Sequence, residues 1–347
     1  MHDKGEGVER DCTEAVECCR GAAKQGDVTA QYNLGVMYAI GRGVERNNAE
    51  AVEWFRRAAD QGHAGAQFNL GAMYANGQGA EKDDAEAVQW FLRAAEQGHA
   101  VAQYYLGVRC FTGRGVEQDD AEAFNWYRKA AEQGYAAAQH DLGECYANSW
   151  GVDGDNAEAE KWFLKAADQG LASAQYDLGL RKAEGWGVKQ DAAEAARWHR
   201  KAAEQGHAEA QYELGAMYAD GRGVRQDYTE AAEWYRKAAD QGHAAAQSIL
   251  GRLYAMGQGV EANTAEAAKW YQKAANQGEA AAQYRLGLLF HDGEGVSKDY
   301  VQAYHWLNLA AASGNADAKS TRDALEKRMT RTQIAEAQCR SRSFHAR

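Results

Sequence analysis

Residues 64–99 read AGAQFNLGAMYANGQGAEKDDAEAVQWFLRAAEQGH, and a unit of this kind recurs every 36 residues without insertion or deletion. A Gln, a Leu-Gly pair three residues after it and a Trp occupy the same positions in eight successive copies, and a partial copy begins upstream at Gly5. Self-similarity at a fixed period is the signature of a repeat array. We therefore predict one array, where the length of 347 residues alone would suggest two or three domains.

Each unit has the pattern of two helices. In the first, Ala66 and Leu70 belong to an apolar face at helical spacing. Gly71 costs about 1 kcal/mol of helix propensity, and its recurrence predicts a close helix–helix approach where no side chain fits. The second helix starts at an Asp cap, directs Trp90 inward and stops at Gly98. Units of this length cannot bury their faces alone, so they stack into a solenoid.

Composition and charge narrow the function classes. The chain has 37 Gly and no Pro, but 45% of its residues are hydrophobic and ten are Trp, which is enough to form a core. A net charge of −11 argues against nucleic-acid binding. No apolar run approaches the roughly 18 residues of a membrane span, so we expect no membrane insertion. The first residues lack the apolar stretch of a secretory signal. We expect a cytoplasmic protein, although the start within a repeat leaves export open.

Glycine-rich loops, acidic pairs and cysteines could carry chemistry, and for each we favour a structural explanation. The GxGV loops lack the third glycine of a dinucleotide-binding fingerprint. Acidic pairs such as Asp83-Asp84 lie at expected helix starts, where they interact favourably with the helix dipole. The six cysteines have no regular spacing, and Cys110 with Cys145, on neighbouring repeats, is the one pair that we single out.

Four histidines occupy the same position in different copies of the repeat, which could suggest a row of metal ligands along the array. Packed helices lie roughly 8–10 Å apart, whereas zinc requires ligands at about 2 Å. We therefore interpret them as exposed turn residues, and we predict no enzyme activity, no cofactor and no metal. These residues are His63, His99, His207 and His243.

The repeat consensus AxAQxxLGxMYxxGxGVxxDxxEAxxWxxKAAxQG resembles the Sel-1-like repeat, a relative of the tetratricopeptide repeat, over about residues 5–318. The resemblance implies an all-α fold, a right-handed α/α solenoid of antiparallel helix pairs, whose first helices line the concave face. We assign residues 1–329 to this solenoid, with a half repeat at the N-terminus and a divergent last helix. Residues 330–347 are assigned to a C-terminal capping helix and tail.

Variable positions on the first helices are the candidates for partner binding. The positions two, five and nine residues after each Gln form one stripe, which is acidic in the middle three units and apolar or aromatic on either side. An acidic centre favours a basic peptide or helix; a solvated acidic face is the alternative. Two neighbouring loops carry Trp where the others are polar, and we expect both to be exposed as hot spots, with local packing as the alternative. The predicted partner-binding residues are Tyr105, Asp141, Glu144, Trp150, Asp177, Leu180, Glu184, Trp186, Glu213 and Asp220.

The resemblance implies a non-catalytic scaffold or adaptor that binds a protein or peptide, possibly a basic one, on its concave face. Related proteins act in signalling and in the assembly of complexes. Two alternatives stay open at this point. One is a protein that binds cell-wall or other small ligands and has weak hydrolase activity, and the other is a regulatory repeat module of a larger protein.

Overall fold

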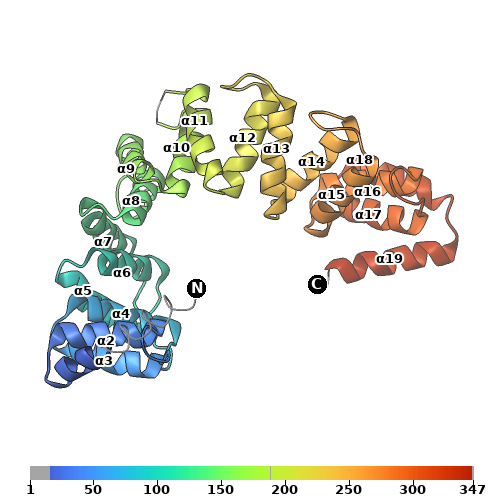
Figure 1. Cartoon of the computed structure of the whole chain (residues 1–347). Helices are drawn as coiled ribbons and strands as arrows, with labels where there is room; N and C mark the ends of the chain where they lie inside the picture. Colours follow the sequence, from blue (N-terminus) through green and yellow to red (C-terminus); the bar gives the residue numbers. More distant parts are fainter. Residues whose placement is uncertain (1–15, 188, 346–347) are drawn as a thin grey trace, which may run out of the picture. The chain divides into compact units, whose positions relative to one another are not determined.

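The computed structural model of the chain describes residues 16–187 and 189–345, so the upstream copy that begins at Gly5 lies partly outside the described residues. Within them every regular element is a helix, which confirms the predicted all-α class (Figure 1). The chain divides into two compact units, Met1–Leu171 and Ala172–Arg347, which we call the first and the second unit. The predicted division between residues 1–329 and 330–347 stays a prediction.

The helices alternate between the first and second helix of successive repeats. The first unit contains a helical stretch over residues 16–24, then α2 (Val28–Ile40), α3 (Asn48–Asp60), α4 (Ala64–Asn76), α5 (Asp84–Glu96), α6 (Ala100–Thr112), α7 (Asp120–Glu132), α8 (Ala136–Asn148) and α9 (Asn156–Asp168). The second unit contains α10 (Ala172–Glu184), α11 (Ala192–Glu204), α12 (Ala208–Asp220), α13 (Tyr228–Asp240), α14 (Ala244–Met256), α15 (Thr264–Asn276), α16 (Ala280–Asp292), α17 (Tyr300–Ala312), α18 (Ala316–Glu326) and α19 (Arg331–His345).

The mid-helix glycines are the sites where the two helices of a pair approach most closely. A Cβ placed on Gly71 would lie 2.9 Å from Cδ1 of Phe91 and 3.1 Å from the carbonyl oxygen of Ala87. The ring of the second helix therefore occupies the space that a side chain on the first helix would need. This confirms the predicted close approach and explains why the array accepts the helix-propensity cost of glycine at this column.

Helix ends follow the predicted turn chemistry at the second helices. Asp83 Oδ1 accepts hydrogen bonds from the backbone N–H groups of Ala85 and Glu86, as an N-cap does. The histidines that share one position of the repeat also cap helices. His63 is half-buried, and its ring stacks on that of Tyr32 with centroids 4.5 Å apart. Its Nδ1 accepts a hydrogen bond from a backbone N–H of α4. These histidines are N-caps of the first helices, so the expectation of simply exposed turn residues was wrong.

A ladder of glutamine side chains explains the invariant Gln column. Gln67 is 4% exposed, and its Nε2 donates to the carbonyl oxygen of Ala59 on the preceding second helix at 3.1 Å. Its Oε1 accepts a hydrogen bond from Nε2 of Gln97, at the end of the following second helix, at 2.7 Å. The buried amide thus bridges the second helices of two successive repeats. Because both its nitrogen and its oxygen form hydrogen bonds, the Gln67 amide can be buried without the energetic cost of an unpaired polar group.

The last rung of this ladder is missing, and this leads to a stability prediction. In the part of the chain that the structure describes, Oε1 of the buried Gln283 has no hydrogen-bond partner, and Ser313 occupies the position from which a Gln donates in the earlier repeats. An unsatisfied buried acceptor costs about 1–3 kcal/mol. We expect Ser313→Gln to raise the free energy of unfolding of the second unit by about 1 kcal/mol, measured by urea denaturation. A gain of the same size in Ser313→Ala, which offers no donor, would contradict this explanation.

One first helix ends without glycine. Ser149 follows α8 with φ of 60°, in the left-handed region that glycine occupies after the other first helices, for example at Gly113 with φ of 66°. A residue with a Cβ is disfavoured by roughly 1–2 kcal/mol in this conformation. Ser149 directly precedes Trp150, one of the two tryptophans predicted to bind a partner. Because a strained residue persists only where its surroundings fix it, the packing around Ser149 also fixes the backbone at Trp150.

The C-terminal helix packs on the last full repeat. Trp126 of an internal repeat has Lys129 Nζ over its ring at 3.8 Å, whereas the ring of Trp306 is covered by Phe344 of α19 with centroids 5.7 Å apart. His305 Nδ1 also lies 3.1 Å from Ser341 Oγ. At Trp306, an apolar contact from α19 therefore takes the place of the cation that covers the ring of Trp126.

Candidate partner-binding face

The candidate face consists of the variable stripe positions of the first helices, which we call the first-helix face, and we describe it separately in each unit. In the first unit it includes Tyr105 on α6 and Asp141 with Glu144 on α8. The side chain of Tyr105 is 40% exposed, and its ring lies against Phe68 at a centroid distance of 5.5 Å. Tyr105 is therefore an accessible aromatic residue supported by the core, as a binding residue requires.

Three of the predicted residues meet around one cavity of about 140 Å³ in the first unit. Trp150 is half-buried, and its ring packs against Phe111 with centroids 5.1 Å apart. The expectation that Trp150 is exposed was therefore wrong, because part of its ring packs on the preceding repeat. The cavity is lined by Phe111, Tyr127, Asp141, Glu144, Cys145 and Trp150, which we call the Trp150 pocket.

Three lining residues of the Trp150 pocket were not predicted from the sequence. Tyr127 and Cys145 are 4% and 1% exposed and belong to the core columns. Phe111 carried a signal that could have been noticed: its column contains Ala in every other full repeat except the last, which has His291. A single bulky side chain in a column of alanines, one repeat before an unusual loop Trp, indicates that the two pack together.

The carboxylate of Asp141 sets the electrostatics of this region. Its side chain is 29% exposed, and Oδ1 lies 2.9 Å from Nδ1 of His140. Burial raises the pKa of Tyr104, and the Asp141 carboxylate, which accepts a hydrogen bond from that hydroxyl, raises it further. Burial followed by the Asp141 charge also raises the pKa of Tyr127, and of the Cys145 thiol to about 12. A carboxylate close to these groups disfavours their ionised forms.

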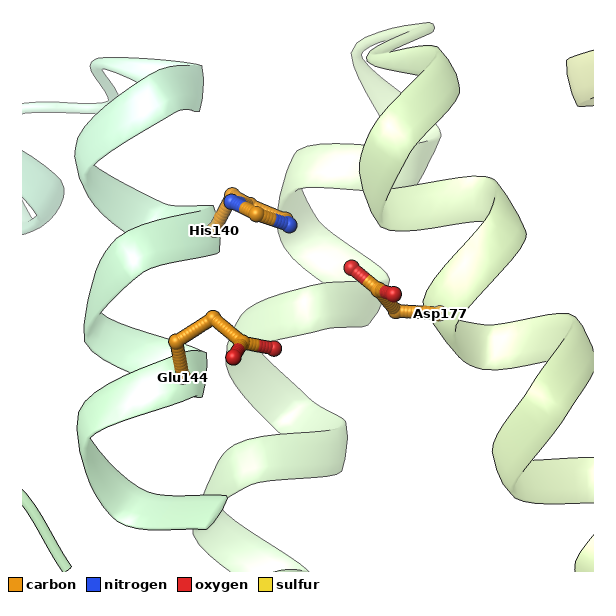
Figure 2. A group of neighbouring side chains, drawn as sticks. All are labelled: His140, Glu144 and Asp177. Atoms are coloured by element: carbon orange, nitrogen blue, oxygen red, sulfur yellow. The ribbon is translucent and has the colours of Figure 1, made fainter. Parts of the chain in front are cut away.

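His140 and Glu144 lie one turn apart on α8, and their side chains extend from the same side of the helix (Figure 2). Glu144 Oε2 also accepts a hydrogen bond from Asn148 Nδ2 at 2.9 Å. Asp177, drawn in the same view, belongs to α10 of the second unit. Two ligand groups are fewer than the three or four protein ligands that zinc sites use, so α8 by itself does not form a metal site.

The cysteine pair singled out from the sequence consists of free, buried thiols. Cys110 and Cys145 are each 1% exposed. Burial, followed by nearby carboxylates, raises the pKa of Cys110 to about 11 and that of Cys145 to about 12. Because the thiolate is the reactive form, both residues are expected to be unreactive at neutral pH.

In the second unit, the loop tryptophan is accessible as predicted. Trp186 is 54% exposed and follows α10. Arg181, at a column that is otherwise mostly apolar, is 7% exposed and its Nη1 lies 3.4 Å from the carbonyl oxygen of Trp186. Its neighbour Lys182 pairs with Glu194 through Nζ and Oε2 at 3.3 Å. The two unusual cations are thus part of the structure that supports the Trp186 loop.

The acidic residues of the second unit also lie on its first helices. Burial raises the pKa of Glu213; the Arg222 cation opposes this effect, and the carboxylate of Glu184 makes a smaller contribution in the same direction as burial. Asp220 Oδ2 lies 3.4 Å from Nε of Arg222. The remaining predicted residues, Asp177 and Leu180, are half-buried on α10.

Further along this unit the first-helix face also carries cationic residues. A groove of about 360 Å³ includes Ile249 and Arg252 of α14 and Arg285 of α16. The second unit therefore carries acidic residues on α10 and α12 and cationic residues on α14 and α16. Among the described residues, no helix is long and apolar enough to cross a membrane.

Taken together, the helix pairs and the variable first-helix face define an α-helical repeat protein of the protein-interaction class. The Sel1 repeat model matches nine consecutive segments, and the chain belongs to the Sel1 repeat family. Sel1 repeats are related to tetratricopeptide repeats and generally serve as protein–protein interaction modules; proteins built from them are typically non-catalytic scaffolds. The matched residues are 1–27, 28–63, 64–99, 100–135, 136–171, 172–207, 208–243, 244–279 and 280–315.

Two solved structures of proteins with this repeat are similar to the chain. A protective antigen present in uropathogenic Escherichia coli strains, described as displaying an SLR fold, is 36% identical, with 98% of this chain and 81% of that one covered and a TM-score of 0.60. A Sel1 repeat protein from Oxalobacter formigenes is 36% identical, with 89% of each chain covered and a TM-score of 0.69. A comparison with curated proteins gave no significant match.

Proposed function

We propose that the protein is a non-catalytic scaffold whose first-helix face, the expected concave side, binds a basic segment of a protein partner. The observation that carries this proposal is the group of carboxylates that the first helices of each unit place on this face. In the first unit these are Asp141 and Glu144 of α8, and in the second unit they are Asp177 and Glu184 of α10 with Glu213 and Asp220 of α12. Complementary charge guides association and selects between partners. A net charge of −11 disfavours nucleic acid as the partner.

One exposed aromatic residue in each unit, Tyr105 on α6 and Trp186 in the loop after α10, supplies the apolar part of binding. Tyr105 and Trp186 are 40% and 54% exposed, and both are large side chains of the kind enriched at interaction hot spots. In each unit, basic residues of the partner would therefore pair with the carboxylates, and an adjacent apolar residue would cover the exposed ring. The cationic positions Arg252 and Arg285 would favour one orientation of that segment along the second unit.

Charge reversal of the face tests the proposal. We expect random peptides selected on the wild-type protein to be enriched in Lys and Arg, and to lose at least about tenfold in affinity for a variant with four acidic face residues replaced by Lys, since several charge pairs are inverted. The substitutions are Asp141→Lys, Glu144→Lys, Asp177→Lys and Glu184→Lys. The measurement is peptide affinity by fluorescence anisotropy, with helical content checked by circular dichroism.

A control with the same change in net charge isolates the face. In this control variant, the four acidic residues replaced by Lys are exposed in the last turn of second helices, away from the face. Lys interacts favourably with the helix dipole at such positions. Neutral or acidic selected peptides, or an equal loss of affinity in both variants, would contradict the proposal. The control substitutions are Glu96→Lys, Glu132→Lys, Glu204→Lys and Asp240→Lys.

A further inference from the structure

The Trp150 pocket combines a closed apolar floor with a charged rim. Its floor is formed by Tyr127 of α7 and Cys145 of α8, which are 4% and 1% exposed. The rings of Phe111 and Trp150 form a wall with an interplanar angle of 48° and centroids 5.1 Å apart. All of these elements lie in the first unit. The pocket is therefore a small hollow on the first-helix face and part of the accessible surface of that unit.

Two carboxylates complete the lining, and none of the six lining residues carries a positive charge. Asp141 and Glu144 are three residues apart on α8, so both lie on one face of the helix. Asp141 accepts a hydrogen bond from the hydroxyl of Tyr104, and its Oδ1 lies 2.9 Å from Nδ1 of His140. Aromatic side chains and carboxylates thus line the same volume of about 140 Å³.

We propose that the Trp150 pocket binds the guanidinium group of an arginine side chain from the partner. A planar cation is attracted to the face of an aromatic ring, most strongly to that of Trp. The same group carries several N–H donors in a fixed fork, which suits the carboxylates at the rim. This inference rests on the proposed function, and it names the side chain of the basic segment that the first unit would recognise.

Other occupants fit the lining less well. An apolar side chain would remove Asp141 and Glu144 from water without providing a counter-charge, which is costly. An acidic side chain would be repelled by both carboxylates. A hard divalent cation needs six or more oxygen ligands, whereas the lining offers two carboxylates among aromatic rings and a thiol.

A ¹⁹F NMR titration tests the pocket directly. The protein is labelled with 5-fluorotryptophan, the Trp150 resonance is assigned with Trp150→Phe, and N-acetyl-arginine amide is added at constant ionic strength. We expect a saturable shift of the Trp150 resonance. N-acetyl-citrulline amide has the same shape without the charge, so it should bind at least about tenfold more weakly.

Matched variants separate the rim from general charge effects. Asp141→Asn combined with Glu144→Gln should raise the dissociation constant of the arginine amide at least about tenfold. Glu132→Gln combined with Asp168→Asn removes the same charge from exposed positions on second helices and should leave it unchanged. Equal binding of the citrulline amide, no saturable shift, or the same constant in both double variants would overturn the proposal.

The outcomes also distinguish this inference from the proposed function. If basic peptides bind the face but the arginine amide does not shift Trp150, the pocket assignment fails and the scaffold function stands. If the arginine amide binds but no basic peptide is selected, the pocket stands and the proposed function fails.

Discussion

Replacing Gly115 by Ala is expected to destabilise the first unit by about 3 kcal/mol or more, because a side chain there meets backbone from the preceding repeat. Gly115 has a φ of +77°, and a Cβ on it would lie 2.1 Å from the carbonyl oxygen of Asp84 and 2.9 Å from the backbone nitrogen of Ala85. Those atoms belong to the start of α5. The second glycine of the loop is thus the point where one repeat packs on the backbone of the previous one.

Gly134→Ala is the matched control for this prediction. Gly134 has a φ of +87°, in the same left-handed region, but among the described residues nothing lies within 4 Å of the position a Cβ would take. Its substitution should cost only the conformational penalty of about 1–2 kcal/mol. Urea denaturation followed by circular dichroism gives both values. Equal losses for the two variants would show that the contact with α5 is not the reason for the glycine.

His199→Phe is expected to stabilise the second unit and to remove much of its acid sensitivity. His199 is 1% exposed and covers Gly179, and among the described residues its Nδ1 has no hydrogen-bond partner. Burial, with smaller contributions from His207 and Arg222, lowers its pKa from 6.5 to about 4, against the opposing effect of Asp177. At neutral pH, removal of the unsatisfied nitrogen should contribute about 1 kcal/mol.

The sign of the pH dependence follows from this lowered pKa. Between about pH 6.5 and pH 4 the unfolded chain binds a proton at His199 that the folded chain does not. Stability is therefore present above pH 6.5 and falls as the pH decreases, by about 3 kcal/mol in total from this residue. Denaturation midpoints at pH 7, 6, 5 and 4.5 should show a smaller decrease in His199→Phe than in the wild type. Parallel decreases would contradict the assignment to His199.

The reciprocal substitution Phe91→His provides a control in the first unit. Phe91 is fully buried over Gly71, in the place that His199 occupies over Gly179. We expect it to introduce an acid sensitivity of the same sign there, because its imidazole would be buried against a mid-helix glycine as that of His199 is. The aromatic residue at this column thus fills the gap left by the mid-helix glycine, and His199 is the variant that titrates.

Much of the fold could be predicted because the repeat shows each constraint many times. The recurrence of Gly71 and its equivalents indicated a close helix approach, and the structure shows the ring of Phe91 in that space. The role of Gln67 could not be predicted, because its two hydrogen bonds reach helices on either side of it. The N-cap role of His63 was missed for a different reason: histidine is an uncommon cap, and its stacking on Tyr32 depends on the preceding repeat.

The candidate site could be predicted only in part. The stripe rule placed Asp141 and Glu144 on one face, and the unusual loop residue Trp150 was noticed. Their meeting with Phe111 depends on packing between successive repeats, which no periodicity within one repeat reveals. For Trp186, the sequence indicated exposure, but the support from Arg181 required the geometry of the loop.

The central claim is that the acidic first-helix face binds a basic segment of a partner. The most direct test is calorimetric titration of a selected basic peptide into the wild-type protein and into the four-residue Lys variant at 50 and 300 mM salt. We predict binding to the wild type that weakens as salt increases, and no measurable binding to the Lys variant, because screening and charge reversal act on the same pairs. Binding that is independent of salt and equal in both proteins would contradict the account.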